Sequence, residues 1–188
     1  MRTVRLGRAH RDVQLAGDLL VRVSEREQAE DVALAVGERI LVATDGSPAA
    51  MEAVAVGVEL ATEHGSEVMF VHVVPLVDVV PATGLAPISG AFLHELSDHD
   101  RTLLVEAAEV AAAEGIVATT VLLRGDTVDE IVAFADSHDA DVIVVGSRGR
   151  GAISGTLLGS VSRGVLAESK RPVLIVRAAA AVAVPQHT

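Results

Sequence analysis

Short apolar runs rich in β-branched residues alternate with longer stretches of helical periodicity from residue 39 onward. The apolar runs cover residues 39–44, 67–74, 117–123, 141–146 and 172–177, and the helical stretches cover residues 48–64, 91–114, 127–138 and 158–169. In the first helical stretch, Met51, Val54 and Val58 fall on one face. Near-continuous apolar runs are typical of strands that are buried on both faces. The alternation therefore predicts an α/β domain with a mostly parallel sheet.

The order of the strands follows from the way parallel strands connect. Right-handed crossovers, with helices covering both faces, favour a doubly wound, five-stranded parallel sheet of the Rossmann-like type in the strand order 3-2-1-4-5. In such a sheet a ligand binds outside the carboxyl ends of the strands where the order reverses, which here is between the first and fourth strands. The loops after those strands are residues 45–47 and 146–160. We therefore expect these two loops to form the functional site.

The loop after the fourth strand is rich in glycine. It contains Gly146, Gly149, Gly151, Gly155 and Gly159, together with several serines and arginines. Glycines allow backbone N–H groups to approach a ligand closely, and the free N–H groups at the start of a helix favour an anion such as phosphate. The strand, loop and helix therefore suggest a phosphate-binding site. The alternative is that these glycines serve only to form turns.

The glycine spacing lacks one common nucleotide motif, matches a second poorly and fits a third. The phosphate loop G-x-x-x-x-G-K-[ST] is absent, and the first strand–helix turn has a single glycine where a dinucleotide fingerprint needs three. Two residues separate Gly146 from Gly149, and nine separate Gly149 from Gly159, which Ser160 follows. With ILVATDGS, FVHVV, ADVIVVGSRGRG, LLGSVSRGVL and KRPVLIV, the pattern over residues 38–177 resembles the nucleotide-binding branch of the universal stress protein family.

The resemblance implies an adenine nucleotide alpha hydrolase-like fold with ATP in the crevice. It places Ala43, Val73 and Val145 around the adenine, Gly146 and Gly149 near the ribose and phosphates, and Gly159, Ser160, Val161 and Ser162 at the phosphates. Asp45 matches the family's acidic residue near the ribose, where it would help the phosphates to hold Mg²⁺. We also expect Arg148 to contact the phosphates. The alternative is that Asp45 is a turn residue, Ser160 a helix cap and Arg148 a solvated loop charge.

Composition narrows the classes of function. Half of the residues are apolar, the formal net charge is −11, and there is no cysteine. The negative charge argues against general nucleic-acid binding, which needs a basic face. The lack of cysteine excludes disulfides and thiolate metal sites. No apolar run approaches the ~18 residues of a membrane helix, and the basic first residues lack the apolar segment of a secretory signal. We expect a cytoplasmic protein that binds neither nucleic acid nor membrane.

The chain divides into three parts. We predict an N-terminal extension over residues 1–37, a universal stress protein domain over residues 38–178 and a tail over residues 179–188. In the extension, Leu15, Leu19, Leu20 and Val23 fall at helical spacing. This spacing predicts a short amphipathic helix in a segment that is otherwise partly disordered. Residues 75–90 are interrupted by proline and glycine, which predicts a long mobile connection that could close over the site.

Three functions fit this pattern. The first is an ATP-binding stress-response or signalling module. The second is a slow ATP hydrolase or phosphoryl-transfer enzyme, in which Asp45 would help to hold Mg²⁺ and Arg148 would stabilise charge, although no residue is a convincing candidate to orient an attacking water. The third is a dimeric interaction module without turnover. The last strand, residues 172–177, is apolar and would form a sheet edge that invites pairing. The resemblance also implies a homodimer through this strand.

Overall fold

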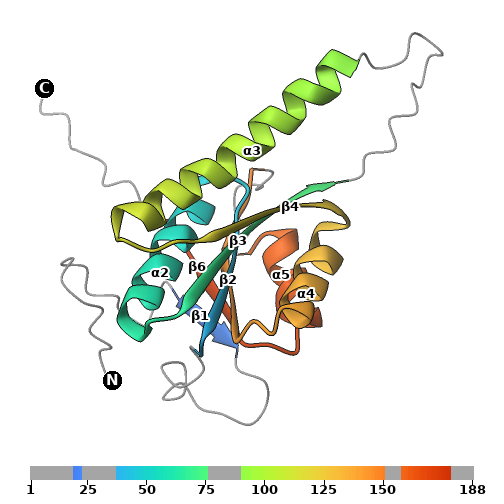
Figure 1. The fold of residues 1–188 in the computed structure, drawn as a ribbon. Coiled ribbons are helices and arrows are strands. Elements are labelled where there is room, and N and C mark those ends of the chain that lie inside the picture. Colours follow the sequence, from blue (N-terminus) through green and yellow to red (C-terminus); the bar gives the residue numbers. More distant parts are fainter. Residues whose placement is uncertain (1–18, 23–36, 76–89, 151–157, 179–188) are drawn as a thin grey trace, which may run out of the picture.

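A six-stranded sheet with helices on both sides makes up the described part of the protein (Figure 1). This computed structural model describes residues 19–22, 37–75, 90–150 and 158–178. The strands are β1 (Leu19–Arg22), β2 (Arg39–Ala43), β3 (Glu67–Pro75), β4 (Thr119–Gly125), β5 (Val142–Gly146) and β6 (Val173–Val176). The helices are α2 (Pro48–His64), α3 (Gly90–Ala113), α4 (Thr127–Ser137) and α5 (Ser160–Glu168). The strand order is β1-β6-β5-β2-β3-β4.

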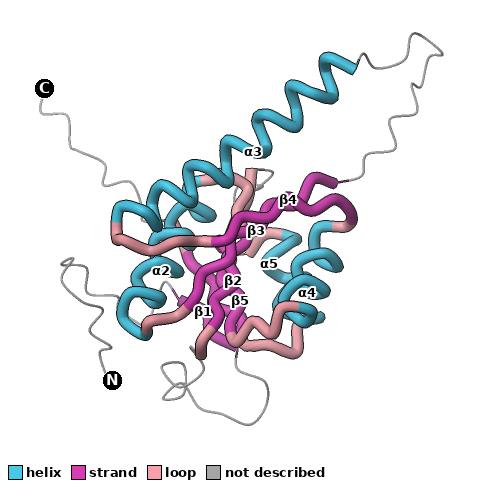
Figure 2. The backbone as a smooth tube through the Cα atoms, in the orientation of Figure 1, coloured by secondary structure: helices cyan, strands magenta, loops and turns pink. Residues whose placement is uncertain are grey.

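The strands from β2 to β6 run parallel, and their order confirms the predicted doubly wound sheet. β2 pairs with β3 on one side and with β5 on the other, while β4 pairs with β3 and β6 pairs with β5. Counted from β2 along the chain, this is the order 3-2-1-4-5, with the switch point between β2 and β5. Figure 2 shows the strands as a central layer with helices on either side.

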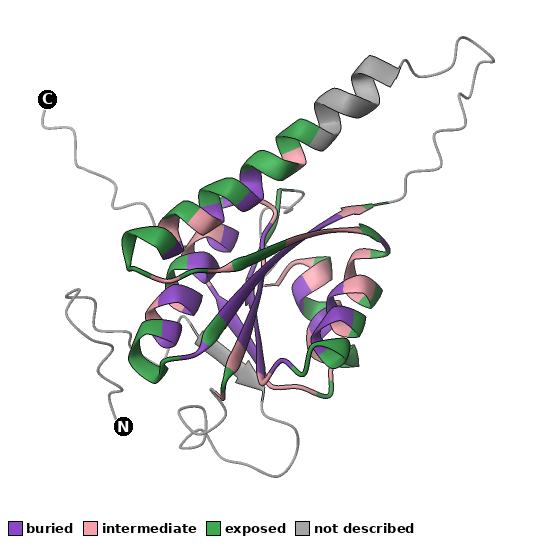
Figure 3. Cartoon of the chain, viewed as in Figure 1, coloured by how far each residue is buried: buried purple, intermediate pink, exposed green. Residues whose placement is uncertain are grey.

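The two faces of the sheet carry separate apolar clusters. Ile40 and Val42 pack with residues of α2 and α3, whereas Leu41, between them in the sequence, packs with residues of α4 and α5. All three side chains are fully buried. Figure 3 shows the same arrangement, with buried central strands and helices that are exposed on their outer sides. Because both faces of β2 are covered, its sequence is apolar without alternation.

Helix α2 has strong signals at both ends. Ser47 is its N-cap, and the Ser47 hydroxyl accepts a hydrogen bond of 3.3 Å from the Ala50 N–H. Pro48 occupies the first helical turn, where the missing N–H costs nothing. Gly65 ends the helix with a φ of 70°, and its N–H donates to the Ala61 carbonyl at 2.8 Å. These local signals were sufficient to predict both helix bounds.

Most predicted bounds differ from the structure by at most one residue, and the larger differences are at β4 and α5. β4 begins at Thr119 rather than at Val117, because pairing with β3 starts where Thr119 lies opposite Met69. Val117 precedes this pairing and is 97% exposed. Helix α5 begins at Ser160 rather than at residue 158, because Gly159 has an extended backbone (φ −68°, ψ 166°) and is the N-cap.

The N-terminal segment contributes a strand where a helix was predicted. Residues 19–22 form β1, which pairs antiparallel with β6 so that Leu19 lies opposite Val176 and Arg22 opposite Val173. The outer edge of β6 offers unpaired backbone donors and acceptors, and satisfying them outweighs a local helical periodicity. Two expectations are therefore wrong for this chain: residues 19–22 are not helical, and β6 is not the edge of the sheet.

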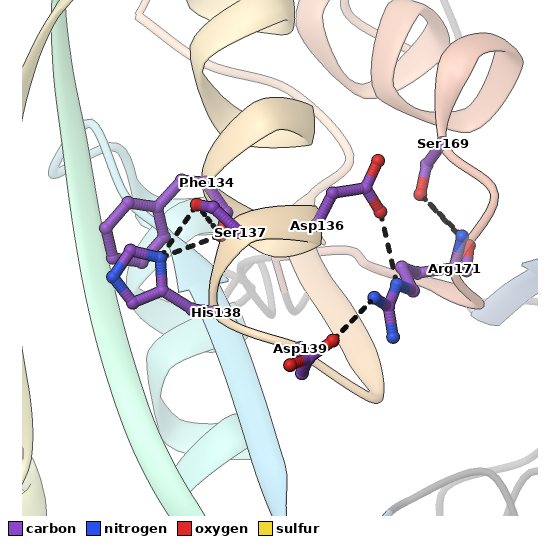
Figure 4. A network of polar contacts seen from close by, with 7 residues as sticks. All are labelled: Phe134, Asp136, Ser137, His138, Asp139, Ser169 and Arg171. Atoms are coloured by element: carbon purple, nitrogen blue, oxygen red, sulfur yellow. Dashed lines mark hydrogen bonds and ion pairs between the residues drawn. The ribbon is translucent and has the colours of Figure 1, made fainter.

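A polar network joins α4 to the segment before β6 (Figure 4). The Arg171 guanidinium donates to Asp136 at 3.2 Å and to Asp139 at 3.4 Å, and the Arg171 N–H donates to the Ser169 hydroxyl at 2.9 Å. The hydrogen bond to Asp136 raises the pKa of Arg171. His138 stacks on Phe134 with ring centroids 3.8 Å apart. These residues precede β5 and β6, so the network fixes the amino-terminal edge of the sheet, opposite the candidate site.

Some predictions concern residues that the structure does not describe. These residues are 76–89 of the predicted connection, 179–188 of the tail and most of the N-terminal extension. The proposed division into three parts therefore stays a prediction. Within the described ranges, no helix is both long enough and apolar enough to cross a membrane.

Candidate functional site at the switch point

The loops after β2 and β5 lie side by side. β2 and β5 are parallel neighbours, and Ala43 at the end of β2 lies opposite Val145 near the end of β5. The chain then continues from β2 into residues 44–47 and from β5 into residues 147–150. The topology therefore brings together the acidic turn and the glycine-rich loop, as the sequence predicted.

Asp45 links the two loops through its carboxylate. One oxygen accepts the Ser47 N–H at 3.0 Å, which closes a local turn. The other oxygen accepts the N–H of Arg150, 105 residues along the chain, at 2.9 Å. Asp45 is partly exposed. A carboxylate has about four lone-pair positions, so these two bonds orient Asp45 and leave it able to accept further donors or a cation.

Ser47 provides a second link that the sequence did not reveal. Besides capping α2, its hydroxyl donates to the Arg148 carbonyl at 3.1 Å. The Ser47 side chain is buried, with 5% of its surface exposed. The sequence predicts the cap from its position before Pro48, but it contains no signal for a contact 101 residues away. The two loops are thus joined at two points, through Asp45 and through Ser47.

Two glycines of the motif are needed for this close approach. A Cβ on Gly146 would lie 2.6 Å from the carbonyl carbon of Ala49 and 2.7 Å from the nitrogen of Ala50, so the end of β5 packs directly on the first turn of α2. A Cβ on Gly149 would overlap a carboxylate oxygen of Asp45. Neither glycine is needed for a positive φ. Their role is close packing, which turn formation alone does not explain.

The start of α5 offers backbone donors to the site. No side-chain hydrogen bond caps this helix at Gly159, whose own N–H donates to the Ser147 carbonyl at 2.8 Å. Ser160 is exposed in the first turn. Ser162 is buried, and its hydroxyl donates to the Gly146 carbonyl at 2.6 Å. The Ser162 hydroxyl therefore supports the loop, while the first turn of α5 has the N–H groups and the dipole that favour an anion.

The three predicted adenine contacts share one face of the sheet. Val73 and Val145 are buried in the cluster on the α4 and α5 side, and Ala43 and Val161 pack against the same cluster. All four lie near the carboxyl ends of their strands or at the start of α5. Arg148, by contrast, is exposed on the loop. The structure thus gathers the predicted residues around one edge of the sheet.

Helix α3 borders the site through contacts that sequence reasoning missed. The His72 ring on β3 lies between the Thr44 carbonyl, 2.7 Å from Nδ1, and an Asp100 carboxylate oxygen, 3.2 Å from Nε2. The Arg150 guanidinium donates to Nε2 of His99 at 3.1 Å. The sequence did suggest that His72 is buried in a strand. Residues 98–100 of α3 are Asp-His-Asp, and their position beside the loops depends on how α3 packs.

Metal binding by protein side chains alone finds no support in the described part of the chain. There, no three histidine, cysteine or acidic side chains gather closely enough to hold an ion. A Mg²⁺ ion at Asp45 would need oxygen ligands from phosphates and water, which is how Mg²⁺ is usually bound in nucleotide sites.

Comparison with known proteins identifies the family of this chain. The family model described as "Universal stress protein family" matches residues 37–177. Universal stress protein MJ0531 of Methanocaldococcus jannaschii is 34% identical over 143 residues, which are 74% of this chain and 82% of that protein.

Two solved structures of similar fold contain adenine nucleotides. One is a universal stress protein in complex with cAMP, at a TM-score of 0.58 and 28% identity, which covers 76% of this chain and 98% of that one. The other is the universal stress protein from Archaeoglobus fulgidus in complex with dAMP, at a TM-score of 0.55 and 28% identity, which covers 75% of this chain and 98% of that one. The chain belongs to the universal stress protein family.

Proposed function

We propose that this protein binds ATP at the switch point between β2 and β5 and acts as a nucleotide-dependent stress-response module. The observation that carries the proposal is the pair of loops joined through Asp45 and Ser47 next to the start of α5, where the N-cap Gly159 has no side chain. An acidic side chain and a set of helix N-terminal donors then lie at the same end of the sheet. The cAMP and dAMP complexes of similar proteins support an adenine nucleotide as the ligand.

Each predicted residue has a place in this proposal. The N–H groups at the start of α5, with the Ser160 hydroxyl, would hold the phosphates. Asp45 would contact the ribose or share a Mg²⁺ ion with the phosphates. Ala43 is partly exposed and would meet the adenine, whereas contacts from the buried Val73 and Val145 would need the neighbouring side chains to move. The Arg148 side chain is exposed and would neutralise phosphate charge. A cytoplasmic location stays a prediction from the sequence.

Calorimetry with ATP and AMP, each with and without Mg²⁺, tests the proposal. We expect ATP to bind more tightly with Mg²⁺ than without it. Asp45→Ala should remove most of this difference and affect AMP less, because AMP lacks the phosphates that would share the ion. Asp129→Ala is the matched control, since Asp129 is exposed on α4. Absence of ATP binding at millimolar ligand would refute the proposed function.

A homodimer through β6 is a further part of the proposal. The pairing of β1 with β6 restricts how such a dimer could form. β6 is apolar and buried, but its outer edge is paired with β1 in this chain. A second copy could use that edge only after β1 has left it. We therefore expect a double variant, Leu20→Pro with Val21→Pro, to dimerise more than the full chain, because proline cannot donate to the ladder.

Light scattering at equal micromolar concentrations measures the two dimer fractions. A larger mean molar mass for the variant, approaching that of two chains, would support pairing at the β6 edge, whereas a monomer in both proteins would count against the homodimer. Equal masses for both proteins would count against self-association at the β6 edge.

A further inference from the structure

His72 is a buried polar side chain next to the candidate site. It lies on β3, two residues after the fully buried Phe70, so both side chains point to the face that α2 and α3 cover. The His72 residue is 8% exposed, and the Asp100 side chain that it meets is 16% exposed. Burying a polar ring among apolar side chains has a cost unless its nitrogens are hydrogen-bonded.

Both ring nitrogens of His72 meet acceptors. The carbonyl oxygen of Thr44, 2.7 Å from Nδ1, can only accept, and an ionised Asp100 carboxylate, 3.2 Å from Nε2, can also only accept. Because a carbonyl can only accept, Nδ1 donates its hydrogen to Thr44, while Nε2 faces the Asp100 carboxylate. His72 thus acts as a bridge that α3 fixes on one side and that holds the backbone after β2 on the other.

The backbone that His72 holds is the residue before Asp45. The Thr44 N–H donates to the Val71 carbonyl at 2.9 Å, which continues the contact between β2 and β3. The Thr44 carbonyl accepts from the His72 ring, and the Thr44 hydroxyl accepts the Gly46 N–H at 3.2 Å. The peptide unit that joins Thr44 to Asp45 is therefore fixed at its carbonyl by His72. A rotation of this unit would move the Asp45 side chain.

We propose that His72 is a positioning residue for Asp45, acting through the Thr44 carbonyl and held in place by Asp100. This inference rests on the proposed nucleotide function, because its consequence is the orientation of Asp45 toward the ligand. Asp45 is in turn the acceptor of the Arg150 N–H. Loss of the His72 contact should therefore loosen the link between the two loops as well as the binding of a nucleotide.

Three substitutions separate the two ends of the bridge. In His72→Asn the side-chain amide can donate near the position of Nδ1, in His72→Gln it can donate near the position of Nε2, and His72→Leu has no donor. We expect His72→Asn to retain affinity for ATP with Mg²⁺ within about twofold. His72→Gln and His72→Leu should lose about five- to tenfold, the size expected for the loss of one hydrogen bond.

A matched control separates positioning from general destabilisation. Leu104→Ala removes a side chain that is buried on the same helix as Asp100 but is apolar. We expect it to lower the free energy of unfolding in urea without a comparable loss of ATP affinity. If ATP affinity in all four variants simply follows the free energy of unfolding, the positioning role is refuted.

A second measurement does not need a ligand. The hydrogen exchange rate of the Arg150 amide, followed by NMR, reports whether Asp45 still accepts its hydrogen bond. We expect faster exchange in His72→Leu and His72→Gln and an unchanged rate in His72→Asn. If the unmodified protein fails to bind ATP, the proposed function is wrong, and the Arg150 exchange rate still decides the positioning role. Equal rates in the three variants would overturn it.

Discussion

Gly146→Ala should lower the free energy of unfolding by about 3 kcal/mol, the upper part of the usual range for an overpacked site. The added Cβ would lie 2.6 Å from the carbonyl carbon of Ala49 and 2.7 Å from the nitrogen of Ala50. Both atoms belong to the backbone in the first turn of α2, which the Ser47 cap holds. A backbone obstacle cannot rotate away, so β5 and α2 must separate. Urea unfolding followed by circular dichroism measures the loss.

Gly159→Ala is the matched control for this prediction. Its Cβ would lie 3.5 Å from the nearest atom, the Cα of Arg148, which is an ordinary contact, and its φ of −68° suits any residue. We expect this variant to lose less than about 1 kcal/mol, as most substitutions do that create no strain or cavity. Equal losses for the two variants would show that the packing of β5 on α2 is not the cause.

Gly149→Val should reduce the affinity for ATP by about a hundredfold while the protein stays folded, if a charge-assisted contact at the site is lost. A Cβ at this position overlaps a carboxylate oxygen of Asp45. Because the obstacle is the end of a side chain, Asp45 can turn away and the fold survives. The Arg150 N–H then loses its acceptor, and the valine methyl groups fill the space between the loops.

Calorimetry with ATP and Mg²⁺, together with the urea midpoint, tests this prediction. Gly149→Ala is a graded control, because it displaces Asp45 but adds only one methyl group to the crevice. We expect its affinity to fall between those of the unmodified protein and of Gly149→Val. Normal ATP affinity in Gly149→Val would mean that the loop after β5 does not contact the nucleotide.

The meeting of the two loops after β2 and β5 was predictable from the sequence. The order of the parallel strands follows from their alternation with helices, and the switch point follows from that order. Asp45 and Gly149 could therefore be assigned to one crevice, and the structure joins them through the Arg150 N–H. Ser47 could be assigned only as a helix cap. Its bond to the Arg148 carbonyl required coordinates, because nothing local in the sequence depends on it.

The N-terminal segment shows why a local pattern can mislead. The spacing of Leu19 and Leu20 with their apolar neighbours fits a helix, yet residues 19–22 form a strand on β6. Periodicity describes which residues share a face of an isolated helix. It contains no information about an exposed sheet edge elsewhere in the fold, and the backbone groups of that edge provided the stronger partner.

The sequence by itself determined the α/β class, the strand order, the caps of α2 and the glycine motif, because each depends on residues that are close along the chain or on general rules of connection. Only the tertiary structure decided that His72 bridges Thr44 and Asp100, that α3 borders the loops and that β1 covers β6. These contacts join segments that are distant in the sequence, and they depend on how α3 packs and on which strand pairs with the sheet edge. A pattern of neighbouring residues contains no information about such long-range packing.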